Sequence, residues 1–114
     1  MRYALFVCAD ESAVISHEER SRRVAACASF QDQMRERGVL LDSEQLHPTQ
    51  TATTVRCWDG GDILVSDGPF AETREQIAGF FIVECKDLDE AIDVATSVPA
   101  AWYGTVEVRP VAET

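Results

Sequence analysis

The sequence is short of basic side chains, and this shortage excludes several kinds of partner. Ten lysine and arginine residues stand against 20 aspartate and glutamate residues, which gives a formal net charge of −10. A field of this sign repels phosphate backbones and anionic lipid surfaces, so we expect no nucleic-acid and no membrane partner. Long hydrophobic runs are missing too, because Asp10 and Glu11 interrupt the apolar start of the chain. We therefore expect a cytoplasmic protein without a membrane span or signal peptide.

Patterns typical of metal and cofactor chemistry are also absent from the sequence. The four cysteines are widely spaced, no two of them form a Cys-x-x-Cys pair, and the two histidines do not lie near each other. Each cysteine sits in an apolar stretch, which favours small core side chains over zinc ligands or disulfides. The sequence has neither a glycine-rich phosphate loop nor a Gly-x-Ser-x-Gly elbow. We predict no metal and no cofactor.

What is present suits a globular α+β fold. A length of 114 residues with 46% apolar side chains favours a single domain over residues 1–114. Residues 2–8 read as a strand. Ser16 and Glu19 form a capping box that opens a helix ending at Gly38, with an apolar stripe at spacings of three and four. The stripe consists of Val24, Cys27, Phe30 and Met34.

The rest of the chain reads as three strands, a hairpin and a second helix. Residues 39–46 read as a strand closed by His47-Pro48, and residues 53–58 and 62–66 flank the turn sequence Asp59-Gly60-Gly61. A strand over 79–86, a helix opened by Asp87 and ended by Pro99, and a last strand over 105–111 complete the order. The helix stripe consists of Leu88, Ala91, Ile92 and Ala95. We predict a ferredoxin-like split βαβ fold with an inserted β-hairpin and an antiparallel sheet.

Two of the predicted strands are apolar on both faces, and this predicts a partner. In such a fold both helices cover one side of the sheet. The apolar side chains of residues 3–8 and 80–83 that point to the other side would therefore be exposed to solvent. Each exposed branched or aromatic side chain forfeits roughly 1.5 to 3 kcal/mol. We therefore predict a homodimer through the sheet faces. Two twisted sheets either leave a cleft at the rim or interdigitate without a cavity.

The stretch SDGPFAETREQ, residues 66–76, is the strongest local signal. Gly68 and Pro69 indicate a turn. In an Asx-turn Asp67 would accept from the amide two residues on, but that residue is Pro69, which has no N–H. Asp67 therefore needs another donor, such as the Phe70 amide, a side chain, water or a ligand. The alternative is that Asp67 only stabilises the turn or caps nearby backbone groups.

Acid–base residues are the candidate catalytic groups. His47 follows the second predicted strand, at the rim of the sheet. There it would contact Asp67 or Glu72 and act as a general base whose imidazole is oriented by the carboxylate. The alternative is an exposed loop histidine. His17, at a helix N-terminus, is expected to face solvent.

Three further residues are candidates for ligand binding. Arg74 would clamp an anionic ligand or pair with a neighbouring carboxylate. Phe70 and Trp58 would line a pocket, or else belong to the core or an interface.

The same residues carry a resemblance to a known family. The sequence resembles the YCII-related family, in the branch named for its Asp-Gly-Pro-Phe motif. The similarity runs from RYALFV through SDGPFAETREQIAGFFIV to DLDEAI and TVEVRPV, nearly the whole chain. This resemblance implies a ferredoxin-like fold that forms a dimeric α+β barrel.

The resemblance implies less about function. Related YCII-type proteins are associated with small-molecule chemistry by a histidine and aspartate pair, but here the first helix carries only His17, in its first turn. The leading hypothesis is a small-molecule-binding homodimer with acid–base, hydrolase-like or lyase-like activity at the sheet rim. The second is a regulatory module that contacts an extracytoplasmic-function sigma factor, since such factors accompany this branch. The third is that the motif only shapes the dimer.

Overall fold

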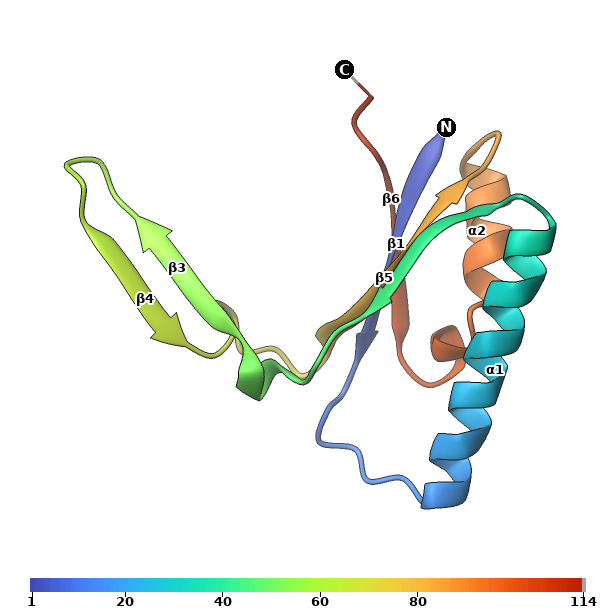
Figure 1. The fold of residues 1–114 in the computed structure, drawn as a ribbon, viewed down its shortest axis with the longest axis horizontal. Coiled ribbons are helices and arrows are strands. Elements are labelled where there is room, and N and C mark those ends of the chain that lie inside the picture. Colours follow the sequence, from blue (N-terminus) through green and yellow to red (C-terminus); the bar gives the residue numbers. More distant parts are fainter. Residues whose placement is uncertain (114) are drawn as a thin grey trace.

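A four-stranded antiparallel sheet covered by two helices forms the main body of the protein. The structure, a computed structural model, describes residues 1–113. The sheet has the order β2-β5-β1-β6, and both helices lie on one side of it (Figure 1). The elements are β1 (Arg2–Ala9), α1 (His17–Glu36), β2 (Leu40–Gln45), β5 (Gln76–Glu84), α2 (Leu88–Ser97) and β6 (Thr105–Pro110). This order is that of a ferredoxin-like split βαβ fold and confirms the predicted α+β class.

The helix boundaries follow from local chemistry that the sequence predicted. The Ser16 side chain accepts a hydrogen bond from the Glu19 amide at 3.0 Å, and the Asp87 carboxylate accepts one from the Glu90 amide at 2.9 Å. Each bond satisfies a backbone donor that has no partner within its helix. After α1 the chain reverses at Gly38, whose φ of 72° suits glycine.

The hydrophobic core lies between the helices and the sheet. Leu5 in β1 and Val83 in β5 are fully buried. Phe30 of α1 meets Phe81 of β5 edge to face, with ring centroids 5.2 Å apart. This layer holds α1 and α2 against the two central strands.

The predicted helix stripes are partly wrong. In α1 only Phe30 and Met34 are buried, whereas Val24 is 65% exposed. Arg23 and Cys27 are partly buried, so the inward side of α1 continues from Phe30 through these two residues, and Val24 lies one residue to the side of it.

The buried stripe of α2 is also shifted relative to the prediction. Leu88 and Ile92 are largely exposed. Ala91 and Ala95 are buried as predicted, and Val94 is buried with them in place of Leu88 and Ile92.

The predicted hairpin forms a separate two-stranded sheet. Strands β3 (Thr53–Cys57) and β4 (Ile63–Asp67) pair with each other across a turn in which Gly60 and Gly61 have positive φ angles. The hairpin stands away from the four-stranded sheet, on the side opposite the helices (Figure 1). The radius of gyration is accordingly 16.3 Å, against about 13 Å for a compact chain of this length.

The face of the sheet that the helices leave open has an apolar centre and charged edges. Phe6 pairs with Phe80 across β1 and β5, and Ala4 pairs with Ile82. On the edge strands the neighbouring positions carry charge, namely Asp42 and Glu44 in β2 and Glu107 and Arg109 in β6. In the part of the chain described, neither helix has the length and apolarity needed to cross a membrane.

Candidate functional site

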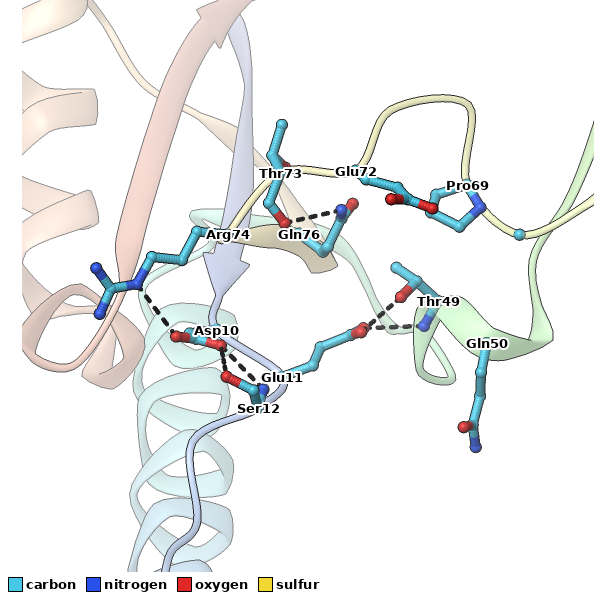
Figure 2. Close-up of a pocket in the computed structure, with 11 residues that line it drawn as sticks. Asp10, Glu11, Ser12, Thr49, Gln50, Pro69, Glu72, Thr73, Arg74 and Gln76 are labelled. Atoms are coloured by element: carbon cyan, nitrogen blue, oxygen red, sulfur yellow. Dashed lines mark hydrogen bonds and ion pairs between the residues drawn. The ribbon is translucent and has the colours of Figure 1, made fainter.

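A cleft of about 450 Å³ lies at one end of the four-stranded sheet. Ala9 at the end of β1 pairs with Gln76 at the start of β5, so the segment that follows β1 meets the segment that precedes β5. The 3-10 helix η1 (Thr49–Thr51) closes the third side (Figure 2). The lining consists of residues 10–12, 49–50, 68–69, 72–74 and 76.

Glu11 fastens two walls of the cleft together. Its Oε1 accepts from the Thr49 amide at 2.9 Å, and its Oε2 accepts from the Thr49 hydroxyl at 2.5 Å. These bonds join segments 38 residues apart in the chain. Because both carboxylate oxygens are already bonded, we assign Glu11 a positioning role.

Asp10 is a second carboxylate that is already bonded. The Ser12 amide and hydroxyl donate to Oδ1 at 2.9 and 2.6 Å, and Arg74 Nε donates to Oδ2 at 3.3 Å. The hydrogen bonds from Ser12, and after them Arg74, hold the pKa of Asp10 below its ordinary value. Asp10 therefore stays ionised and orients Arg74, whose side chain is 90% exposed.

Glu72 is the carboxylate of the cleft that remains available. It lies beside Pro69 in Figure 2, and no group in residues 1–113 donates a hydrogen bond to it. Its loop is braced by Gln76, whose side-chain amide donates to the carbonyls of Ala71 and Thr73 at 3.0 and 3.1 Å. A braced loop thus presents a carboxylate without an internal partner to the cavity.

A smaller hollow of about 310 Å³ adjoins the cleft. Asp10 and Arg74 line both hollows, so their ion pair separates them. Trp102 and Tyr103 line the far side of the smaller hollow. The Arg23 guanidinium lies 3.7 Å from the centre of the Tyr103 ring, a cation–π contact that fixes this ring.

The Asp67-Gly68-Pro69-Phe70 motif forms the joint between the hairpin and the cleft. Asp67 is the last residue of β4 and is exposed, and within residues 1–113 its carboxylate accepts no hydrogen bond. Gly68 makes the bend with a φ of 95°, and its amide donates to the Ala52 carbonyl at 2.8 Å. The Thr54 hydroxyl donates to the Gly68 carbonyl at 2.7 Å. Backbone bonds at Gly68, rather than an Asx-turn at Asp67, hold this joint.

The structure brings only some of the predicted site residues together. Glu72 and Arg74 line the cleft, whereas His47 lies exposed beyond β2 and outside the lining. Phe70 is 80% exposed, and Trp58 is 52% exposed next to the hairpin turn. In the described chain no hydrogen bond or ion pair joins His47 to Asp67 or to Glu72.

Sequence reasoning missed Asp10 and Glu11 as cleft residues. In the sequence they stand out only as the acids that interrupt the apolar start of the chain. A signal was present, because antiparallel pairing of strands 2–8 and 79–86 places the end of one beside the start of the other. The same reasoning would have placed both acids opposite the loop that contains Glu72.

The carboxylates of the cleft do not form a cluster of metal ligands within residues 1–113. In residues 1–113 no three histidine, cysteine, aspartate or glutamate side chains are grouped so as to hold a metal ion. The carboxylates of Asp10 and Glu11 are bonded to protein groups, as described above.

Comparisons with known proteins cover the whole chain. The family model of the YCII-related domain matches residues 1–114. An uncharacterised protein of Rhizobium meliloti (strain 1021) is 40% identical over 116 aligned residues, which span 98% of this chain and 93% of that protein. Agreement of this extent, on a ferredoxin-like fold with an inserted hairpin, shows that the chain belongs to the YCII-related family.

Proposed function

We propose that this protein binds a small organic molecule in the cleft at the end of the sheet. The observation that carries the proposal is the Glu72 carboxylate, which faces the cavity without a donor from residues 1–113. Polar groups that face a cleft without an internal partner are available to a ligand, and a volume of about 450 Å³ lies in the range of small-molecule sites.

The two available charged groups define the ligand chemistry. Glu72 would accept hydrogen bonds from a hydroxyl or ammonium group of the ligand. Arg74 uses one N–H on Asp10, and its other donors suit a carboxylate or another oxyanion. A molecule that carries both a donor and an anionic group would engage both side chains.

Acid–base chemistry is the reaction class that this site would support. Glu72 would serve as the general base, because Glu11 and Asp10 are bonded to protein groups. Proton abstraction coupled to hydrolysis or elimination needs no cofactor: Glu72 would take the proton, and water in the open cleft would supply one to the leaving group. Asp67 and His47 lie outside the cleft lining, so the proposal assigns them no step of the reaction.

The proposal includes a homodimer formed through the open face of the sheet. Phe6, Phe80 and Ile82 stay partly exposed there, in the two central strands. A two-fold interface would cover these side chains in both copies at once, because the same patch meets itself. The charged residues of β2 and β6 that pair with this apolar band would form a polar rim around it.

Ligand binding is tested by two-dimensional NMR with a panel of small amines, alcohols, carboxylates and amino acids. We expect hits to shift the amides of residues 10–12, 49–50 and 68–76. Glu72→Gln and Arg74→Ala should weaken these hits by about tenfold or more, the loss of one charge-assisted hydrogen bond. Glu36→Gln, an exposed glutamate at the end of α1, serves as the control. Hits that bind equally to Glu72→Gln, or a panel without hits, would refute the site.

The assembly is tested separately by sedimentation velocity. The wild-type protein should sediment as a dimer at micromolar concentration, and Phe80→Asp should sediment as a monomer because it buries a charge in the apolar band. Glu107→Gln, at the charged edge of the same face, should remain dimeric. A wild-type monomer at that concentration would rule out the sheet-face dimer without bearing on the cleft.

A further inference from the structure

The β3–β4 hairpin has one apolar face and one mainly polar face. Val55 pairs with Val65 and Cys57 with Ile63, so these four side chains point to one side. The other side carries Thr54, Arg56, Leu64 and Ser66. Alternation of this kind, interrupted here only by Leu64, is typical of a strand pair with one face buried.

This apolar face has no cover in the described chain. Val55 is 59% exposed, Ile63 68% and Val65 61%. Two-stranded hairpins without such cover are at best marginally stable in water. A face patterned for burial and left wet therefore predicts an occupant from outside the chain.

The attachment of the hairpin limits what that occupant is. The hairpin is held at its base, by the Gly68 amide on the Ala52 carbonyl and by the Thr54 hydroxyl on the Gly68 carbonyl. From there it extends away from the sheet on the side opposite the helices, which is the side of the open face (Figure 1). A molecule seated on the open face would therefore lie next to the hairpin.

We propose that the occupant is a second copy of this chain, and that each hairpin lies with its apolar face against the partner. This inference rests on the sheet-face dimer proposed above. The hairpin and the open face of the sheet lie on the same side of the molecule (Figure 1). In a two-fold assembly each copy would cover both the open face and the apolar hairpin face of the other.

The dimensions of the open face support a second contact strip. The apolar band of the sheet is two strands wide, roughly 10 Å at the usual strand spacing. A standard interface takes about 800 Å² from each partner, apolar centre and polar rim together, and a band of this width supplies only part of the apolar centre. The hairpin adds a second apolar strip.

The charges favour contact through the same face of the hairpin. Each copy carries a net charge of −10, so association of two copies must avoid close contact between acidic surfaces. The apolar face has one charged side chain, Asp67 at its base, opposite Thr53. It is therefore a surface on which two acidic copies can meet.

Cys57 provides a direct probe, because it lies on the apolar face. Its alkylation by iodoacetamide is followed by peptide mass spectrometry at protein concentrations below and above the dimer dissociation constant. We expect alkylation at least about tenfold slower in the dimer, since a covered thiol reacts slowly. The matched control is Cys57→Ser with Ser66→Cys, which moves the thiol to the polar face and should react equally fast in monomer and dimer.

Each result of the alkylation experiment decides the proposal. Slower alkylation of Cys57 in the dimer, with unchanged alkylation at position 66, supports it. A dimer in which Cys57 reacts as fast as the control overturns the hairpin contact and leaves the sheet-face dimer standing. Protection of Cys57 in the monomer shows cover by its own chain, and a monomer at all concentrations removes the partner; either overturns the proposal. None of these outcomes depends on ligand binding in the cleft.

A second pair of variants tests the same contact through affinity. Val65→Asp should weaken dimerisation by about a hundredfold. The substitution is present in both copies, so it removes two symmetry-related contacts, each worth about tenfold in affinity. Ser66→Asp adds the same charge one residue away on the polar face and should change the affinity little. Equal effects of the two substitutions would show that the charge, rather than the apolar face, determines association.

Discussion

The four-stranded sheet and the β3–β4 hairpin use the same kinds of residue and end in opposite environments. Val83 in β5 is fully buried, whereas Val65 in β4 is 61% exposed. Both belong to strands with alternating or continuous apolar residues. The difference lies in the layer above them, since α1 and α2 cover one region and nothing in residues 1–113 covers the other. A strand pattern thus predicts that a face needs cover without saying what supplies it.

Truncation of a buried side chain should separate the two regions most strongly. Leu5→Ala should lower the free energy of unfolding by about 2 to 5 kcal/mol, because it leaves a cavity beneath the helices. Val65→Ala should change it by less than about 0.5 kcal/mol in the monomer, because its surroundings are already wet. Urea denaturation at concentrations where the protein is monomeric measures both. Similar losses for the two variants would mean that the hairpin packs against its own chain.

Glycine substitutions should give the next largest contrast. A Cβ at Gly79 in β5 would lie 2.7 Å from the Glu44 carbonyl oxygen of β2. Gly79→Ala should therefore destabilise the fold by about 1 to 3 kcal/mol, because two sheet backbones must move apart. Gly60→Ala, at a φ of 97° in open space, should cost only about 1 kcal/mol of local strain. Thermal unfolding compares the two, and an equal decrease in Tm would contradict the close approach at Gly79.

Removal of the N-cap of α2 should weaken the helix layer over the sheet without changing any residue of the strands. Asp87→Ala deletes the bond to the Glu90 amide and should lower stability by about 1 kcal/mol. Amide hydrogen exchange should accelerate in β1 and β5, which the helices protect, and remain unchanged in the already exposed β3 and β4. Asp89→Asn, in the first turn of α2 but without the capping bond, is the control. Faster exchange in the hairpin would show that its stability depends on α2.

The smallest expected effect concerns the pH dependence of the cleft. The folded state holds the pKa of Asp10 below its unfolded value, chiefly through hydrogen bonds from Ser12 and secondarily through Arg74. The stabilisation is therefore present above the unfolded pKa and is lost as pH falls through the folded pKa. Carbon-13 NMR titration should find a pKa for Asp10 below its ordinary value of 3.8. Ser12→Ala should raise it more than Arg74→Ala does; the reverse order would assign the main role to the ion pair.

The sequence predicted the fold in some detail, because its signals were local. Capping residues at Ser16 and Asp87 and the Gly60-Gly61 turn each specify a backbone conformation within a few residues. The prediction for Val24 was wrong because apolar spacing does not fix the buried side of a helix to within one residue. Arg23, rather than Val24, lies on the partly buried side of α1, where its guanidinium packs on the Tyr103 ring.

The candidate site was less predictable, because it depends on contacts between distant segments. The polar loop after the Asp-Gly-Pro-Phe motif indicated Glu72 and Arg74, which the structure places in the cleft. The prediction that His47 meets Asp67 relied on strand ends sharing a rim, yet Asp67 belongs to the hairpin, which is not part of that sheet. Asp10 and Glu11 enter the cleft only through the register of β1 with β5.

Gly68 belongs at once to the wall of the cleft and to the last hydrogen bond at the base of the hairpin. If a ligand binds in the cleft as proposed, a tilt of the hairpin would displace the wall, and a ligand in contact with the wall would tilt the hairpin in return. Subunit pairing and ligand occupancy would then alter each other's equilibrium constants by one common factor, as linkage requires.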